Sequence, residues 1–245
     1  MPGISLNAKF MFILKDISKT YGPVRALDKI NIEIPTNNFV VILGPSGCGK
    51  STLLRHLCFI EIPDEGNIKL TLNGSVFESW KSERPWPRLT CVFQKQFLWP
   101  HLTLRENKEL PLKSNQRSTS EEVDKIIDQF EMQNFIDRYP NEVSGGQAQR
   151  AALVRAFVLK PEIMLIDEAH GGLDLEQQHI LNSHFVSLKH LEVGLIVVTH
   201  SLEFAQKYAD FIVVLENGQV TDVGDKSVFS NPHSRFLKLA LSNLE

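Results

Sequence analysis

The feature that most constrains this chain is a glycine-rich stretch that fits the pattern G-x-x-x-x-G-K-[ST] at every fixed position: Gly44-Pro45-Ser46-Gly47-Cys48-Gly49-Lys50-Ser51-Thr52. Five apolar residues of strand length, 39–43, precede it, and residues 53–58, with apolar side chains at helical spacing, follow it. A strand, a glycine loop and a helix form the context in which this motif binds phosphate. The stretch therefore predicts an α/β fold built around a phosphate loop.

The residue types in this loop suit the phosphates of a nucleoside triphosphate. Glycines let successive backbone N–H groups turn inward toward phosphate oxygens, and the following helix adds the partial positive charge of its N-terminus. Lys50 is placed to reach the outer phosphates, and Ser51 offers a hydroxyl to Mg²⁺. The alternative is a glycine-rich turn that binds nothing, and the flanking strand and helix disfavour it.

Composition excludes several other classes of protein. The 245 residues, 42% hydrophobic and 22% charged, suffice for one large domain or for a domain with a subdomain. The formal net charge of -3 gives no basic field for nucleic acid. The three cysteines show neither metal-ligand spacing nor a disulfide framework, which fits a reducing cytosol. No apolar stretch approaches the ~18 residues of a membrane span, and residues 1–9 lack the apolar core of a signal peptide, so we expect any membrane role to go through a partner.

Apolar periodicity predicts the secondary structure. The alternating residues 30–34 are typical of a half-buried antiparallel strand, whereas the continuous apolar run 163–166 is typical of a buried parallel strand. Further strands are predicted over 12–17, 39–43, 68–72, 91–93, 195–199, 211–215 and 220–223, with hairpin turns at Asn73-Gly74 and Asn217-Gly218. Helices are predicted over 53–58, 118–135, from Ser144 to Pro161, 175–191 and 236–241. We therefore expect a phosphate-loop ATPase core with a mainly parallel sheet, an N-terminal antiparallel β-subdomain and an inserted α-helical subdomain.

Two carboxylates follow the apolar run 163–166. At the carboxyl end of a strand in a phosphate-loop protein, Asp167 would hold Mg²⁺ through water, and Glu168 would orient and activate the attacking water. A solvated helix start is the alternative, which the apolar strand disfavours. His200 also ends a buried strand and is a candidate donor to the γ-phosphate, with a structural histidine as the equal alternative. Tyr21, in a turn upstream of the loop, would either stack on a base or pack on the sheet.

Taken in order, these motifs resemble the ATP-binding subunit of an ABC transporter from about Phe12 to the C-terminus. The resemblance rests on Tyr21, the phosphate loop, Gln94, Val143-Ser144-Gly145-Gly146-Gln147, Asp167-Glu168, Asp174 and His200. Many ATPases share the phosphate loop, but Ser-Gly-Gly-Gln followed by residues 148–152 is close to diagnostic of the family. Three short stretches look most like the polar amino-acid importers: residues 93–103, Phe204-Ala205 and Asn231-Pro232.

The resemblance implies a dimer, expected to be a homodimer, with two ATP molecules held between two chains. Ser144, Gly145, Gly146 and Gln147 would face the γ-phosphate of the nucleotide on the other subunit, and Asp174 would cross the interface. Gln94 would bind Mg²⁺ or water, and Tyr21 would stack on adenine. The catalytic residues would be Lys50, Gln94, Glu168 and His200. The ligands of Mg²⁺ would be Ser51, Gln94 and Asp167. The expected cofactors are ATP and Mg²⁺.

The resemblance also implies partners and a location. The chain would lie at the cytoplasmic face of the membrane, held there by transmembrane permease subunits, with a solute-binding protein as an indirect partner if it serves an importer. Import of a polar amino acid is the expected role. The alternatives are a subunit of an ABC exporter, a soluble ABC ATPase outside transport, and a small-molecule kinase, which leaves residues 144–147 unexplained.

The resemblance divides the chain and marks two departures from the family pattern. A single domain over 1–245 would comprise two parts. The first is a catalytic core with the antiparallel part, 10–93 and 161–245. The second contains the Gln loop, the helical subdomain and the signature motif, 94–160.

Val143 stands where Leu is usual in the family, which is a mild change. Ala169-His170-Gly171-Gly172 stands where Pro-Thr-Ser-Ala is usual. Two added glycines and a lost proline are expected to loosen this loop and the coupling of hydrolysis across the dimer.

Overall fold

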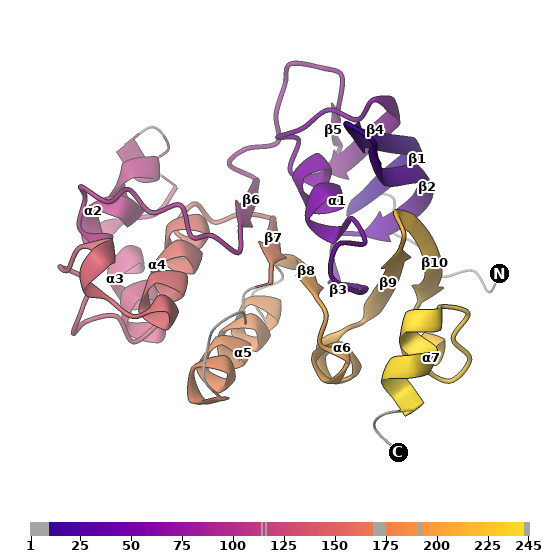
Figure 1. The fold of residues 1–245 in the computed structure, drawn as a ribbon. Helices are drawn as coiled ribbons and strands as arrows, with labels where there is room; N and C mark the ends of the chain where they lie inside the picture. The colour runs from indigo at the N-terminus through magenta and orange to yellow at the C-terminus, as the bar shows by residue number, and fades with distance from the viewer. Residues whose placement is uncertain (1–9, 114, 116, 169–174, 191–192, 243–245) are drawn as a thin grey trace. The chain divides into compact units, whose positions relative to one another are not determined.

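The computed structural model describes residues 10–113, 115, 117–168, 175–190 and 193–242. The chain divides into two compact units (Figure 1). The first unit comprises Met1–Pro85 with Gly194–Glu245, and the second comprises Trp86–Val193.

The first unit contains a four-stranded antiparallel sheet, as expected near the N-terminus. Its strand order is β2-β1-β4-β5. Phe12 of β1 pairs with Ile34 on one side and with Leu70 on the other, and all three side chains are buried. The turn between β4 and β5 has positive φ at both Asn73 and Gly74, which matches the right-handed twist of the strands it joins. The strands are β1 (Phe10–Tyr21), β2 (Val24–Pro35), β4 (Glu65–Leu72) and β5 (Ser75–Glu78).

The same unit also contains mainly parallel strands, in the order β10-β9-β3-β8. The central strand β3 is parallel to β8 and to β9, and all of its residues are buried, which explains its unbroken apolar sequence. β10 pairs antiparallel with β9 through the predicted Asn217-Gly218 turn. These strands are β3 (Phe39–Leu43), β8 (Gly194–Thr199), β9 (Phe211–Glu216) and β10 (Gln219–Gly224). The helices of the unit are α1 (Lys50–Leu57), α6 (Leu202–Tyr208), α7 (Arg235–Ser242) and the 3₁₀ turn η3 (Lys226–Phe229).

The second unit contains two parallel strands and a group of helices, of which α2, α3 and α4 lie together in Figure 1. Leu89 of β6 pairs with Ile163 of β7. The elements are β6 (Leu89–Val92), α2 (Leu104–Glu109), η1 (Leu110–Lys113), α3 (Ser120–Gln129), η2 (Pro140–Glu142), α4 (Gly145–Phe157), β7 (Ile163–Asp167) and α5 (Leu175–His190). The combination of parallel strands, antiparallel sheet and helices confirms the predicted α/β class.

The helix predicted over 118–135 is wrong in its last third, because α3 ends at Gln129. Glu131 adopts a left-handed φ of 51°, which stops the helix and turns the chain. The apolar residues beyond it, Met132 and Phe135, are still buried, so they continue the core from a different backbone path. Apolar spacing alone does not reveal that change of path. The start of the predicted helix is correct to within two residues, and Thr119 and Glu122 form a capping box there.

A buried histidine forms part of the core of the second unit. The ring of His184 in α5 stacks on the ring of Phe130, with centroids 4.0 Å apart and planes 17° from parallel. Its side chain is 7% exposed, and its Nε2 has no hydrogen-bond partner among the described residues. Burial, reinforced by the positive charge of Arg150, lowers the pKa of His184 to about 4. The folded protein therefore keeps this imidazole neutral at neutral pH.

His184 should make the fold less stable in mild acid. In the unfolded chain the pKa of this histidine is near 6.5, whereas in the folded protein it is about 4. Between these two values the unfolded state binds a proton that the folded state does not bind. The free energy of unfolding therefore falls as the pH drops through this window. The loss amounts to about 2 kcal/mol by pH 5. His184→Phe keeps a ring against Phe130 and should remove this part of the pH dependence, as measured by urea unfolding at pH 7 and pH 5. The control is His101→Phe, a change at an exposed histidine, which should keep the parental pH dependence. Equal pH dependence in His184→Phe and the parent would contradict the prediction.

Candidate functional site

The phosphate loop joins β3 to α1 with the backbone geometry that its glycines permit. Gly44, Gly47 and Gly49 all have φ between 77° and 156°. A Cβ atom on Gly44 would lie 2.1 Å from the carbonyl oxygen of Leu215, and one on Gly49 would lie 2.3 Å from that of Ala26. No other residue fits at these two positions, because both neighbours are backbone atoms that cannot move aside. The loop is thus a cradle fixed by its close packing.

Lys50 is held inside this cradle. Its ammonium donates hydrogen bonds to the carbonyl oxygens of Gly44, at 2.9 Å, and Pro45, at 2.8 Å, and the residue is 5% exposed. Its charge therefore sits among the inward-facing groups of the loop, at the start of α1, where an anion is favoured. Ser51 and Thr52 follow in the first turn of α1. These residues fit the phosphates of a nucleotide.

Cys48 helps to hold the phosphate loop in its conformation. Its carbonyl accepts a hydrogen bond from the amide of Gly218, at 3.0 Å, and its side chain is buried. Burial raises the pKa of the Cys48 thiol, although the nearby Lys50 charge acts in the opposite direction. The thiol therefore stays protonated and acts as a small apolar side chain.

Two further predicted residues belong to the same unit. Tyr21 ends β1, rather than lying in the turn expected from the sequence, and its side chain is 40% exposed. Its hydroxyl donates a hydrogen bond to Glu61 at 2.5 Å. His200 follows directly after β8 and is exposed, so it stands at the carboxyl end of the strand as predicted.

The second unit brings Gln94 and Glu168 together. Gln94 comes two residues after β6, and Glu168 directly follows β7. Because these two strands are paired and parallel, both residues lie at the same edge of the strand pair. The Gln94 amide nitrogen lies 3.4 Å from a Glu168 carboxylate oxygen. Asp167, the last residue of β7, is 5% exposed. This arrangement suits a carboxylate that orients water beside one that reaches a cation.

The Ser144–Gln147 stretch forms the start of α4. Ser144 is the N-cap: its hydroxyl accepts from the Gln147 amide at 3.2 Å, and its own amide donates to the Gln147 side chain at 3.0 Å. Gly145 and Gly146 occupy the first turn, where amide groups point out of the helix end. The N-terminus of a thirteen-residue helix is suited to an anion, as the resemblance requires.

The loop after Gln94 is fastened to α4 by contacts that sequence reasoning missed. Arg155 of α4 donates to the carbonyl oxygens of Phe97, at 2.7 Å, and Gln96, at 2.9 Å. Gln149, also in α4, accepts a hydrogen bond from the Gln96 side chain at 3.1 Å. Burial lowers the pKa of Arg155, yet two carbonyls satisfy its guanidinium. Only the run of helix-forming residues around Arg155 was visible in the sequence, and it carried no signal for this role.

Apolar side chains project from this loop. Phe97 has a left-handed φ of 48° and is 60% exposed, although its ring meets the edge of Phe93 at 6.0 Å. Trp99 is 51% exposed. More than half of each side chain is therefore outside the core.

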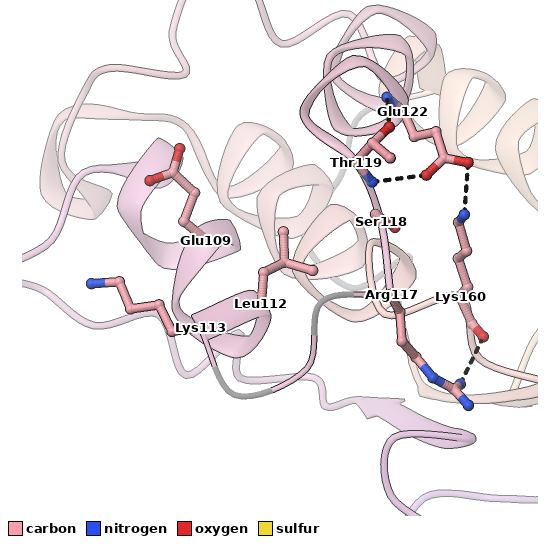
Figure 2. Close-up of a pocket in the computed structure, with 8 residues that line it drawn as sticks. All are labelled: Glu109, Leu112, Lys113, Arg117, Ser118, Thr119, Glu122 and Lys160. Atoms are coloured by element: carbon pink, nitrogen blue, oxygen red, sulfur yellow. Dashed lines mark hydrogen bonds and ion pairs between the residues drawn. The ribbon is translucent and has the colours of Figure 1, made fainter.

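A groove of about 620 Å³ in the second unit contains none of the predicted site residues (Figure 2). Glu122 accepts hydrogen bonds from the Thr119 amide and from the Lys160 ammonium, each at under 3 Å, and Arg117 donates to the Lys160 carbonyl. Figure 2 shows these groups joined to one another on one wall. The groove is therefore not part of the candidate site.

Some predicted features lie outside the described residues, namely Asp174 and the unusual stretch Ala169–Gly172. Within the described ranges, no three His, Cys, Asp or Glu side chains gather as a metal site, and Mg²⁺ commonly binds through one or two carboxylates, water and substrate phosphates instead. Among the helices that the structure describes, none combines the length and apolarity that a membrane span requires.

Comparison with known proteins decides the family. Residues 27–171, more than half of the chain, match the sequence model of the family described as ABC transporter. This chain belongs to the ABC transporter family of ATP-binding proteins. The resemblance drawn from the motifs is thereby confirmed, and the expected class of enzyme, an ATPase, is that of the family.

The relatives of this ABC protein include several import proteins. The arginine transport ATP-binding protein ArtP of Escherichia coli K12 is 35% identical over 240 residues, which cover 94% of this chain and 98% of ArtP. The spermidine/putrescine import ATP-binding protein PotA of Nitrosomonas europaea is 34% identical over 91% of this chain and 62% of PotA. The chain likewise spans 64% of the sulfate/thiosulfate import protein CysA of Synechocystis, at 37% identity.

Solved structures confirm the fold of the ABC protein. The ATP-binding cassette MJ0796, in a dimeric post-hydrolysis state bound to ADP and Pi, superposes with a TM-score of 0.76 at 31% identity. The match covers 87% of this chain and 98% of that one. The structure of an ATP-binding subunit of an ABC transporter gives a TM-score of 0.78 at 24% identity, a likeness of fold alone.

The contacts of Arg155 predict that it holds the loop after Gln94 in place. Arg155→Met keeps most of the apolar length but loses both hydrogen bonds, so the amides of residues 95–98 should exchange hydrogen at least about tenfold faster. Hydrogen-exchange mass spectrometry measures this directly. Arg117→Met, which removes another arginine-to-carbonyl bond of the same unit, should leave the exchange of residues 95–98 unchanged. Unaltered exchange in Arg155→Met would show that the loop is held by other contacts.

Proposed function

We propose that this protein is the ATP-binding and ATP-hydrolysing subunit of an ABC importer and works as a dimer beneath a transmembrane permease. The observation that carries the proposal is the cradle between β3 and α1, in which glycine-only packing surrounds the Lys50 ammonium. Its family membership and the ADP- and Pi-bound state of MJ0796 support hydrolysis of ATP as its reaction.

In this proposal, different residues of the chain serve separate parts of phosphoryl transfer. Lys50 and the loop amides would bind the phosphates and stabilise their charge, and Ser51, Gln94 and Asp167 would hold Mg²⁺. When bound, Mg²⁺ neutralises charge on the phosphate oxygens. Glu168 accepts a proton from the attacking water, whose position the Gln94 side chain helps to fix. His200 donates a hydrogen bond to the outer phosphate, and Tyr21 stacks on the base.

A second copy of the chain completes the site in this proposal. Ser144, Gly145, Gly146 and Gln147 at the start of α4 bind the γ-phosphate of the partner's nucleotide, and Asp174 lies at the interface. The dimeric state named for MJ0796 supports this use of two copies. The N-terminus of α4 offers the positive end of a helix dipole to that anion.

The proposed solute is a polar amino acid. ArtP, a relative matched along nearly its whole length, is named for arginine transport, whereas other relatives are named for polyamine and sulfate import. Selectivity would lie in the permease and in a solute-binding protein, which this chain contacts only indirectly. The subunit would be held at the cytoplasmic face of the membrane through the permease.

Glu168→Gln should bind MgATP and accumulate as a closed dimer. The amide keeps the size of the side chain and still hydrogen-bonds water, but it does not accept a proton from it. Hydrolysis should fall by ~10² or more, and ATP should shift the protein to a dimer on a sizing column. Lys50→Ala is the control and should lose nucleotide and remain monomeric. If Glu168→Gln hydrolyses ATP at near the parental rate, the base lies elsewhere, and His200→Ala is the next variant to assay.

The exposed rings of Phe97 and Trp99 should form part of the surface that contacts the permease. Apolar side chains exposed together on one loop mark contact surfaces more often than single ones do, and these two stand on the loop that begins at Gln94. Phe97→Ala should weaken co-purification with the membrane partner while the affinity for ATP stays at the parental value. Trp80→Ala removes a ring that is 64% exposed elsewhere and should leave co-purification intact. Loss of folding in Phe97→Ala, or undiminished co-purification, would refute the role in docking.

A further inference from the structure

The aromatic ring of Tyr21 is anchored at its hydroxyl end by two charged side chains. The hydroxyl donates to Glu61 at 2.5 Å, and it accepts a hydrogen bond from the Arg55 guanidinium at 3.3 Å. Arg55 also donates to the second Glu61 oxygen at 3.1 Å, so the three groups form a closed triangle. All three belong to the first unit.

Glu61 is itself held by the end of α1. The helix ends near Cys58, and the amides of Ile60 and Glu61 both turn back to the carbonyl of Arg55, at 3.2 and 3.4 Å. The loop therefore wraps around Arg55 and presents the Glu61 carboxylate to the tyrosine. Partial burial acts to raise the pKa of Glu61, but hydrogen bonds from Tyr21 and Arg55 lower it overall, so the carboxylate is ionised at neutral pH.

The triangle connects to the phosphate loop. Arg55 donates a further hydrogen bond to the hydroxyl of Thr52 at 3.1 Å, one turn earlier on α1. Thr52 is the last residue of the glycine-rich motif. One guanidinium thus contacts both the tyrosine that would meet the base and the motif that would hold the phosphates.

Lys19 covers one face of the Tyr21 ring. Its ammonium lies 5.6 Å from the ring centroid, held by Asp64 at 2.8 Å and by the Ile62 carbonyl at 3.2 Å. Asp64 also accepts from the amide of Thr20, at 2.8 Å, which fixes the strand end beside the tyrosine. The residue is 40% exposed, so part of its surface remains open to a planar ligand.

We infer that Glu61 and Arg55 are positioning residues that hold the Tyr21 ring ready to stack on the nucleobase, in register with the phosphate loop. This inference rests on the proposed function, because the ligand is the base of the bound ATP. A ring fixed before binding loses little rotamer freedom when the base arrives, so the anchor raises affinity for the base and leaves affinity for the phosphates unchanged. Neither Glu61 nor Arg55 touches the base.

The test compares two ligands that differ by the nucleoside. The dissociation constants of MgATP and of inorganic tripolyphosphate with Mg²⁺ are measured by calorimetry, and their ratio reports the contribution of the nucleoside. Tyr21→Ala should reduce this preference for ATP by about 5- to 150-fold, the range for loss of base stacking on an aromatic ring. Tyr21→Phe keeps the ring but loses the anchor, and it should reduce the preference by about 2- to 10-fold, as should Glu61→Ala. Affinity for tripolyphosphate should stay at the parental value in all three variants.

A double variant separates anchoring from a general effect on the fold. If Glu61 acts through the tyrosine hydroxyl, Tyr21→Phe with Glu61→Ala should lose no more preference for ATP than either change alone. The matched control is Glu162→Ala, which breaks a similarly exposed arginine–glutamate pair with Arg88 and should leave the preference unchanged. Equal weakening of ATP and tripolyphosphate by Glu61→Ala would show a merely structural role and overturn the inference.

The remaining outcomes distinguish this inference from the proposed function. If the parent binds MgATP and Tyr21→Ala loses the preference, but Tyr21→Phe and Glu61→Ala keep it, the ring stacks without needing its anchor and the inference is wrong while the function stands. If Tyr21→Ala also keeps the preference, the base lies elsewhere and the inference is again wrong. If the parent binds no MgATP, the proposed function itself fails.

Discussion

The close packing of the phosphate loop against backbone atoms is the constraint on which the first unit depends. Gly44 lies against the carbonyl of Leu215 in β9, and Gly49 lies against that of Ala26 in β2. The turn after β9 reinforces this, because the amide of Gly218 donates to Cys48 and its carbonyl accepts from the amide of Asp28. One loop therefore contacts both the antiparallel sheet and the parallel strands: a side chain at Gly49 would push it away from β2, and one at Gly44 would push it away from β9.

The second unit depends on a different interaction, the parallel pairing of β6 with β7. Their common direction places Gln94 and Glu168 at the same edge, and the backbone continues from Gln94 into a loop that Arg155 fastens to α4. A side chain suited to orient water, an exposed aromatic loop and a helix N-terminus are thus linked by a few hydrogen bonds. In the proposed function these are the groups that meet water, the permease and the partner's nucleotide.

The sequence predicted those features whose cause is local. The phosphate loop, the start of a helix at Ser144 and the buried strands follow from short motifs and periodicity, and the structure contains all of them. The end of α3 escaped prediction because apolar spacing continues past Glu131 although the backbone does not stay helical. The roles of Arg155 and Glu61 escaped because their partners lie 58 and 40 residues away in the chain, and no pattern marks such contacts.

The helix α4 connects the loop proposed to contact the permease with the helix end proposed to bind the partner's nucleotide. Ser144 caps the helix, and Arg155 lies eleven positions further along it, about 16 Å at 1.5 Å per residue. If α4 moves as one rigid element, a displacement of the Gln96–Phe97 carbonyls that Arg155 holds would also displace the end at Ser144. Within the proposed function, a permease that pulls on this loop would thereby change how Ser144 meets the γ-phosphate on the other chain. The coupling needs no contact beyond two hydrogen bonds and an unbroken helix.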